Sequence, residues 1–212
     1  MDFSQAISIL NHYTKENLKG KNAHLEIAPF RAQYSNLQSS SPKIAAVLVL
    51  LYPVKDETHF VLIERTTYKG QHSGQISFPG GKQEKADISI IETALREAKE
   101  ETNIYKEDLQ IIGELSKVFI PPSNFEVTPI LATSNKRPDF IPNKREVVNI
   151  LEIKIKDLID PKVMKKIKIE FDNGKTLNTP CFDLNSKTVW GATAMILNEL
   201  KHYLIDAQKE KY

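Results

Sequence analysis

A chain of 212 residues with 29 basic and 27 acidic side chains has a formal net charge of only +2, and its basic residues are scattered, so it lacks the electrostatic footprint of a nucleic-acid-binding protein. Its length suits one domain with a sizeable core, over residues 1–212, because no linker rich in Pro, Gly or Ser divides it. The single cysteine, Cys181, excludes an internal disulfide, and neither a signal peptide nor a run of roughly 20 apolar residues is found, so we expect a cytoplasmic protein that does not insert into a membrane.

The hydrophobic pattern predicts a mixture of helices and strands. Apolar residues at helical spacing from Ser4 to Leu18 predict an N-terminal helix, followed by a loop, together covering about residues 1–42. Apolar runs between turn residues predict strands at 44–51, 59–65, 75–78, 109–119, 125–132, 147–155, 167–171 and 176–182. Asp172-Asn173-Gly174 is a strong signal for a hairpin between the last two. With helices at about 88–102 and 192–207, the sequence predicts an α/β protein with a mixed sheet between helices.

An acidic cluster in the predicted helix 88–102 points to chemistry. Glu97, Glu100 and Glu101 are spaced i, i+3 and i+4, so they share one helical face, where like charges destabilise by roughly 0.2–0.5 kcal/mol per pair. A hard divalent cation, Mg²⁺ or Mn²⁺, suits such carboxylates, and it would favour metal-assisted attack on a phosphate ester or anhydride. The alternative is a solvated acidic face paired with Arg96 and Lys99.

The neighbouring sequence argues for the metal. The turn Pro79-Gly80-Gly81 precedes the helix, and an apolar face of Ile88, Ile91, Leu95 and Ala98 is expected to be buried while the acids lie on another face. From Gly81 to Ile104 the sequence resembles the Nudix box, the signature of the Nudix hydrolases. Arg96, Glu97, Glu100, Glu101 and Ile104 match its second half.

Two positions depart from the box pattern. One extra residue separates Gly81 from Arg96, so that Asp87 holds the early acid position when counted from Gly81. Asn103 replaces a late glycine, and asparagine tolerates the left-handed conformation that glycine supplies at a helix end.

The longer spacing resembles the coenzyme A pyrophosphatase branch of the family. That branch also has an upstream element, here Leu62-Ile63-Glu64-Arg65 followed by Gly74-Gln75-Ile76-Ser77-Phe78-Pro79-Gly80-Gly81, although Gly70, with Lys69 beside it, replaces a usual basic residue. The resemblance continues through Val118–Phe125 and Thr188–Ala194 and covers most of residues 43–205. It implies an α/β/α sandwich of Nudix type.

The resemblance also implies roles for particular residues. Glu97, Glu100 and Glu101 would bind Mg²⁺ or Mn²⁺, and Arg96 would brace them. The predicted substrate-binding residues are Arg65, Lys69, Gly80 and Gly81. Ordinary surface positions for the two cations and a plain turn for the two glycines are the alternatives. Glu146 is a candidate for a second acid outside the box, with a surface role as its alternative.

The implied activity is that of a pyrophosphatase, a hydrolase acting on an acid anhydride. The substrate would be coenzyme A or an acylated or oxidised form, cleaved to 3′-phosphoadenosine 5′-phosphate and 4′-phosphopantetheine or its acyl derivative. Another nucleoside diphosphate derivative, such as ADP-ribose or a dinucleoside polyphosphate, is an alternative substrate. A catalytically silent Nudix domain that senses a nucleotide is an alternative of a different class. The expected partner is thus a small nucleotide, and a homodimer is left open.

Overall fold

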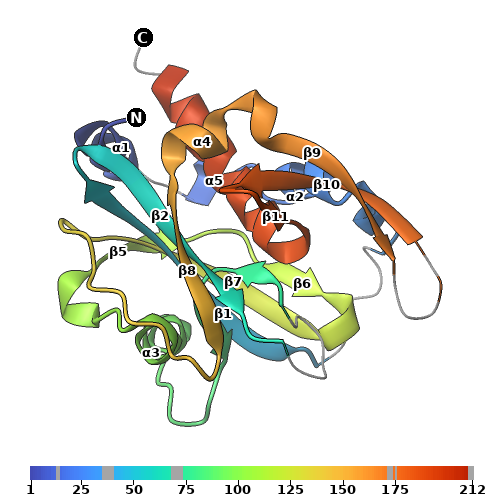
Figure 1. The fold of residues 1–212 in the computed structure, drawn as a ribbon, viewed down its shortest axis with the longest axis horizontal. Helices are drawn as coiled ribbons and strands as arrows, with labels where there is room; N and C mark the ends of the chain where they lie inside the picture. Colours follow the sequence, from blue (N-terminus) through green and yellow to red (C-terminus); the bar gives the residue numbers. More distant parts are fainter. Residues whose placement is uncertain (13–14, 35–40, 68–73, 171–173, 175, 210–212) are drawn as a thin grey trace.

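The computed structural model describes residues 1–212 except 13–14, 35–40, 68–73, 171–173, 175 and 210–212 (Figure 1). The helices are α1 (Phe3–Leu10), α2 (Lys21–Ile27), α3 (Ile90–Thr102), α4 (Ile155–Ile159) and α5 (Gly191–Lys209). Short 3₁₀ helices lie at Lys15–Asn17, Pro29–Tyr34, Lys106–Asp108, Pro121–Ser123 and Pro161–Val163. The strands are β1 (Lys43–Val54), β2 (Glu57–Arg65), β3 (Ile76–Ser77), β4 (Gly80–Lys82), β5 (Gln110–Glu114), β6 (Val118–Ile120), β7 (Phe125–Thr133), β8 (Val147–Lys154), β9 (Met164–Glu170), β10 (Thr176–Leu184) and β11 (Lys187–Val189).

Strand β1 lies at the centre of a mixed sheet built from β1 to β8. It pairs antiparallel with β2 and β4 and parallel with β7. The path through the sheet runs β3-β2-β1-β7-β5, with β8 on β2 and β6 on β7. Strands buried on both faces consist of nearly continuous apolar residues, and β1 has this character.

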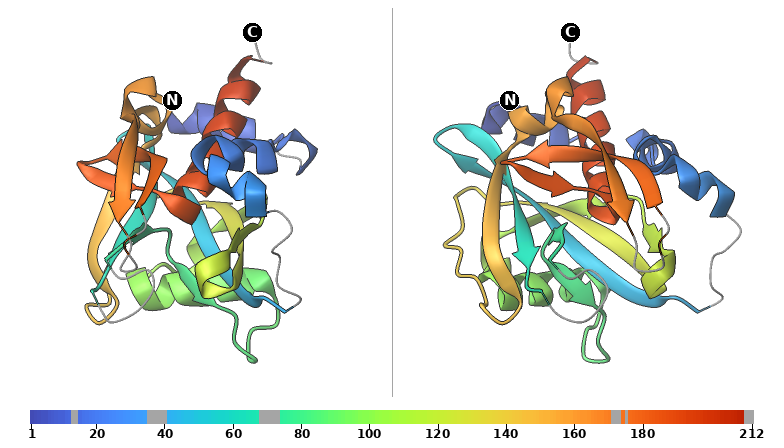
Figure 2. Two further views of the ribbon diagram at one scale, coloured as in Figure 1. Left: turned by 90° about the vertical axis from the view of Figure 1, so that its right-hand side faces the viewer. Right: turned by 45° about the vertical axis from the view of Figure 1, so that its right-hand side comes forward.

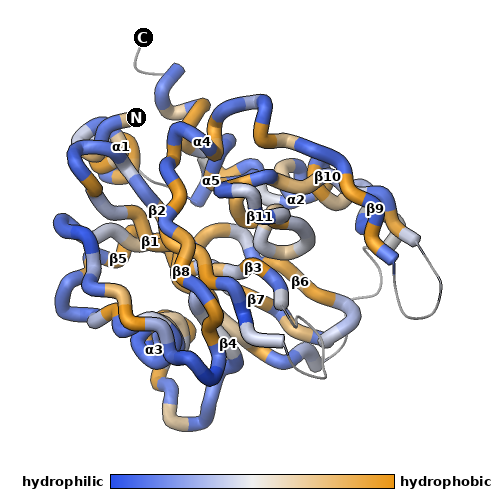
Figure 3. The backbone as a smooth tube through the Cα atoms, viewed as in Figure 1, coloured by the Kyte–Doolittle hydropathy of each residue, from blue (hydrophilic) through white to orange (hydrophobic). Residues whose placement is uncertain are grey.

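Alternate residues of β1 point to opposite faces of the sheet and enter two hydrophobic clusters. Leu48 and Leu50 pack with Ala94 and Ala98 of α3. Val49 and Leu51 face the other cluster, which includes residues of α1, α2, α5 and β10. The sheet therefore lies between α3 and a layer of helices, which confirms the predicted α/β fold (Figures 1 and 2). The strands of this sheet are largely hydrophobic in Figure 3, whereas the loops around α3 are hydrophilic.

Strands β9, β10 and β11 form a second, antiparallel sheet beside α5. The predicted hairpin is confirmed, since β9 and β10 pair with Ile167 opposite Thr179. Its turn residues Asp172 and Asn173 lie outside the described residues. Because β10 shares a hydrophobic cluster with the mixed sheet, we propose that residues 1–212 form one domain. In the described part of the chain, no helix is long and apolar enough to span a membrane.

The N-terminal prediction was partly wrong. The first helix ends at Leu10, and the segment predicted as a loop contains α2, where Ala23 and Ile27 are fully buried. Asp2 begins the first helix with a capping box to Gln5. A helix of seven residues spans only two turns, too few for its apolar spacing to stand out in the sequence.

Two further boundaries differ from the prediction. Ile88, expected on the buried helical face, is 90% exposed, because α3 begins only after its N-cap Ser89. The predicted strand 109–119 is split into β5 and β6, which both pair with β7. The break falls around Leu115, whose N–H donates to the Pro129 carbonyl.

Candidate active site

Helix α3 carries the acidic cluster, and its own sequence fixes both of its ends. The side chain of Ser89 accepts a hydrogen bond from the N–H of Glu92 at the N-terminus. At the C-terminus, Asn103 has a left-handed backbone with φ of 63°, the conformation for which this residue was predicted to replace glycine. The small buried side chains of Ala94 and Ala98 let the helix pack closely on the sheet.

The three acids of α3 differ sharply in exposure. The side chain of Glu100 is 53% exposed, that of Glu97 is 15% exposed, and that of Glu101 is fully buried. Glu97 lies against β4: a Cβ atom added to Gly81 would stand 2.5 Å from its carboxylate. Only glycine leaves room for this approach, so the glycine turn and the acidic helix form one unit.

Arg96 connects the acids to the loop that precedes the helix. Its Nη1 donates to Glu97 Oε1 at 2.9 Å and to Glu100 Oε2 at 3.3 Å. Its Nε and Nη2 donate to the two oxygens of Asp87 at 2.9 and 3.0 Å, a bidentate pair. The hydrogen bonds from Arg96 hold the pKa of Asp87 well below its usual range. Glu92, one turn before Arg96 on the helix, pairs with Lys106 at 3.9 Å.

Glu101 joins the acidic helix to two other elements. Its Oε1 accepts a hydrogen bond from Arg65 Nη1 at 2.7 Å, and its Oε2 accepts one from the Gly80 N–H at 2.8 Å. Burial raises the pKa of Glu101 to about 7, although the nearby Arg65 charge and the Gly80 N–H act in the opposite direction. The structure thus brings three predicted site residues together at one buried carboxylate.

Glu146 reaches the site from the turn before β8. Burial raises the pKa of Glu97, and the negative charges of Glu100 and Glu146 act in the same direction. The turn is fixed by its own hydrogen bonds, since the Glu146 N–H donates to the Asn143 carbonyl at 2.9 Å. The Asn143 N–H in turn donates to the carbonyl of Glu101 at 3.0 Å, so the turn is tied to the acidic helix.

The donor set of this site suits a hard divalent cation. Mg²⁺ prefers one or two carboxylates together with waters and phosphate oxygens, and Glu97 and Glu100 are held together by one nitrogen of Arg96. Each carboxylate oxygen keeps a lone pair beyond one hydrogen bond, so Glu101 can contribute as well. Among the described residues, no three His, Cys, Asp or Glu side chains are already arranged so that they could hold a metal ion together. The carboxylate oxygens instead accept hydrogen bonds from Arg96, Arg65 and Gly80.

Sequence reasoning placed most of the site but not all of it. Glu97, Glu100, Glu101, Arg96, Arg65, Gly80 and Gly81 lie together around the start of β4 and the last turns of α3. Lys69, the other cation predicted to bind substrate, lies outside the described residues. Asn143 was missed, because nothing in its local sequence shows that its N–H reaches α3. Asp87 was noted for its position, but its pairing with Arg96 was not predicted.

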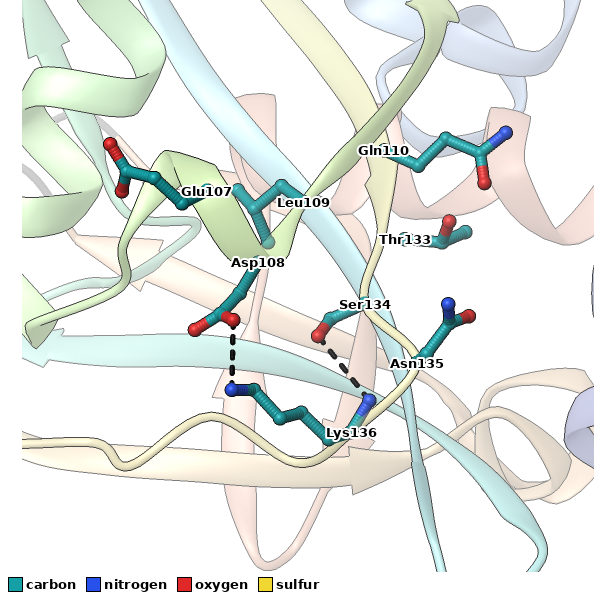
Figure 4. A pocket seen from close by; sticks show the side chains of 8 residues that line it. All are labelled: Glu107, Asp108, Leu109, Gln110, Thr133, Ser134, Asn135 and Lys136. Atoms are coloured by element: carbon teal, nitrogen blue, oxygen red, sulfur yellow. Dashed lines mark hydrogen bonds and ion pairs between the residues drawn. The ribbon is translucent and has the colours of Figure 1, made fainter.

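A separate pocket of about 400 Å³ lies away from these residues, between 107–110 and 133–136 (Figure 4). Its polar groups largely satisfy one another. Lys136 Nζ pairs with Asp108 at 2.8 Å, and the Lys136 N–H donates to Ser134 Oγ. None of the predicted site residues lines this pocket, so we assign it no part in the chemistry.

The fold and the acidic helix define a member of the Nudix family. Residues 42–171 match the family model described as NUDIX domain, which covers more than half of the chain, and the chain belongs to this family. The predicted resemblance is therefore confirmed for the family, and the activity class that it implies, hydrolysis of a diphosphate linkage in a nucleotide derivative, is supported.

Relatives of this chain are likewise named as Nudix hydrolases without a stated substrate. The chain is 33% identical over 167 residues to a protein of Pectobacterium atrosepticum named uncharacterized Nudix hydrolase NudL, covering 76% of this chain and 83% of the relative. A protein of the same name from Yersinia enterocolitica is 31% identical over 163 residues, with 76% and 82% covered. Among solved structures, a MutT/nudix family protein from Enterococcus faecalis matches with a TM-score of 0.50 and 17% identity, covering 91% of this chain and 74% of that one, and supports the fold.

Proposed function

We propose that this Nudix hydrolase cleaves the diphosphate linkage of coenzyme A or of its acylated or oxidised derivatives, with Mg²⁺ or Mn²⁺ as cofactor. The products are 3′-phosphoadenosine 5′-phosphate and 4′-phosphopantetheine or its acyl derivative. The observation that carries the proposal is the convergence of the box helix with both parts of the upstream element: at Glu101, Arg65 of the first part and Gly80 of the second part both donate hydrogen bonds. That element is the part of the sequence that resembles the coenzyme A branch.

Glu97, Glu100 and Glu101 are the residues that would hold the cation. A bound divalent cation neutralises charge on the two phosphates and lowers the pKa of a coordinated water. The protein's part is to keep the three carboxylates together against their mutual repulsion. Arg96 does this for Glu97 and Glu100, and Asp87 fixes Arg96 through its bidentate contact.

The attacking water must lose a proton to a nearby carboxylate. One candidate is Glu97, whose side chain is 15% exposed; burial raises its pKa when no cation is bound, and a bound cation would act in the opposite direction. Glu146 approaches Glu97 from a different element and is the second candidate. Which of the two accepts the proton depends on where the water lies, so both belong in a mutational test.

The two alternatives make different demands on the site. Another nucleoside diphosphate derivative would use the same acids, and the resemblance of the whole upstream element to the coenzyme A branch argues against it. A silent nucleotide-binding domain gains nothing from three acids that repel phosphate in the absence of a cation. The geometry favours an enzyme, because those acids are individually held by Arg96 and Arg65.

The test is a substrate panel with Mg²⁺ or Mn²⁺, with the products followed by phosphorus NMR or chromatography. Coenzyme A, 3′-dephospho-coenzyme A, an acyl-coenzyme A, ADP-ribose and a dinucleoside polyphosphate form the panel. The highest kcat/KM on a coenzyme A substrate supports the proposal. Preference for ADP-ribose or a dinucleoside polyphosphate would overturn the substrate class, and no hydrolysis of any member would favour the silent domain.

A further inference from the structure

Arg65 is a partly buried side chain beside the acidic cluster, unlike a cation that is exposed to bind a substrate phosphate. It is the last residue of β2, and it lies on the strand face that Val61 turns toward α3, since alternate residues share a face. Glu64 lies on the opposite face, where its carboxylate pairs with Lys187 at 2.8 Å. The Arg65 side chain is only 22% exposed, and its Nη1 lies 2.7 Å from the fully buried Glu101.

Arg65 is one of two hydrogen-bond partners that hold the buried Glu101 carboxylate. Its two oxygens are satisfied by Arg65 and by the Gly80 N–H, and the carboxylate itself has no exposed surface. Removing one partner of a buried ion pair leaves the other charge uncompensated, and this is far more disruptive than losing a surface pair. Arg65 is the cation that the structure supplies to this carboxylate.

The backbone around Arg65 is fixed from both sides. Opposite Glu64 and Arg65, strand β8 contains one unpaired residue, Val148, so that the pairing shifts there. Such a bulge bends its strand and increases the local twist, which aims a side chain in a new direction. The next residue after β2 is Thr66, whose N–H donates to the Glu146 carbonyl at 2.9 Å. The end of β2 is therefore joined to the same turn that is tied to α3.

We infer that Arg65 is a positioning residue, which holds the Glu101 carboxylate beside Glu97 and so shapes the cation site, while recognition of substrate phosphates falls to other cations. This inference rests on the proposed role of the three acids in binding a cation. It does not depend on the identity of the substrate. A positioning role and a phosphate contact predict different losses when Arg65 is replaced.

The primary experiment measures Mn²⁺ binding without substrate, for instance by electron paramagnetic resonance of the free ion. Arg65→Met should raise the Mn²⁺ dissociation constant about 10- to 100-fold, the usual loss when a group that orients a metal ligand is removed. Arg65→Lys, which keeps the charge, should recover part of this loss. Lys187→Met is the matched control, because it removes the ion pair on the opposite face of the same strand, and it should leave Mn²⁺ affinity unchanged.

Kinetics then separate the two roles. If Arg65 positions Glu101, Arg65→Met at saturating Mn²⁺ lowers kcat and changes KM by less than about twofold, since uniform substrate binding is retained. The double variant Arg65→Met/Glu101→Gln should bind Mn²⁺ no more weakly than Glu101→Gln alone, because residues acting through one another are not additive. This double variant also contains no uncompensated buried charge, so it keeps the test valid if Arg65→Met fails to fold.

Three results would overturn the inference. Unchanged Mn²⁺ affinity in Arg65→Met together with a raised KM would make Arg65 a substrate contact and leave the proposed function intact. Full additivity in the double variant would show that the two residues act independently. Absence of Mn²⁺ binding by the wild-type protein would refute both the inference and the proposed cation site. Weak coenzyme A hydrolysis with the expected Mn²⁺ pattern would instead refute only the substrate class.

Discussion

Alanine substitutions at the two adjacent glycines of β4 should have different effects, since Gly80→Ala should mainly lower stability and Gly81→Ala should mainly lower activity. Gly80 has φ of +151°, and a Cβ added there would lie 2.3 Å from the Ala46 carbonyl oxygen and 2.6 Å from Val47 Cα, which are backbone atoms of β1. At Gly81 the three atoms nearest to the added Cβ all belong to the carboxylate of Glu97, at 2.5 to 2.7 Å. One clash is with rigid backbone in the centre of the sheet, and the other is with the end of a flexible side chain.

These contacts set the expected magnitudes. For Gly80→Ala, about 1–3 kcal/mol of backbone strain adds to a clash that nothing nearby can relieve, so we expect a loss of at least about 3 kcal/mol in the free energy of unfolding. For Gly81→Ala, rotating Glu97 away costs about 0.5–1.5 kcal/mol. The carboxylate must retreat by about 0.9 Å to restore an ordinary contact of about 3.4 Å. Since a 1 Å misplacement costs on the order of 100-fold in rate, kcat/KM should fall about 10- to 100-fold.

Urea unfolding and steady-state hydrolysis of the preferred substrate with Mg²⁺ would be measured on both variants. Gly174→Ala serves as the control, because Gly174 has φ of +75° and, among the described residues, no atom lies within 4 Å of its added Cβ. That variant should lose about 1 kcal/mol of stability and keep its activity. A Gly81→Ala enzyme as active as the wild type would refute the placement of Glu97 against the turn. A Gly80→Ala protein as stable as the wild type would refute the β1–β4 geometry.

Four other outcomes concern charge, cation binding, substrate choice and one turn. Glu101→Gln should cut turnover by orders of magnitude. Burial raises the pKa of Glu101 from 4.5 to about 7 in the folded protein, so its ionisation removes about 3 kcal/mol of metal-free stability as the pH rises from 4.5 to 7. In urea unfolding with EDTA, the stability of the variant relative to the wild type should therefore rise by about 3 kcal/mol between pH 4.5 and pH 7.5, and a difference that stays constant with pH would contradict this. Mg²⁺ or Mn²⁺ at a hundredfold excess over Kd should stabilise the wild type by roughly 2.7 kcal/mol, which is measured as a rise in Tm. The triple Gln variant of Glu97, Glu100 and Glu101 should show no rise in Tm, and a rise equal to that of the wild type would mean that the cation binds elsewhere. Lys69→Ala should narrow the preference for coenzyme A over 3′-dephospho-coenzyme A if that side chain contacts the 3′-phosphate, a contact worth about 1.5–3 kcal/mol, whereas equal effects on both substrates would exclude it. Asp56→Gly should stabilise the β1–β2 turn by about 0.5–1 kcal/mol in urea unfolding, because Asp56 has φ of +64°, and a destabilised variant would refute this assignment of the turn.

Local sequence determined those parts of the protein that depend on neighbours along the chain. The spacing of Glu97, Glu100 and Glu101 put the acids within about one helical turn, and Asn103 in place of glycine ended the helix in the left-handed conformation. The apolar runs located most strands, and the Asp-Asn-Gly signal located the β9–β10 hairpin. Periodicity and turn chemistry act over a few residues, so a single sequence displays them directly.

Contacts between distant segments were decided only by the tertiary structure. Arg65 and Glu101 are 36 residues apart, and their ion pair forms because α3 packs on the sheet face toward which Val61 and Arg65 of β2 point. The loop before α3 absorbs the extra residue of the box, which brings Asp87 to Arg96 and leaves Ile88 exposed. Such outcomes depend on which strands pair and where a bulge falls, and no local pattern encodes that choice. The sequence therefore indicated which groups are candidates for the chemistry, whereas the packing of α3 against β1 and β4 decided which of them are buried and held in place.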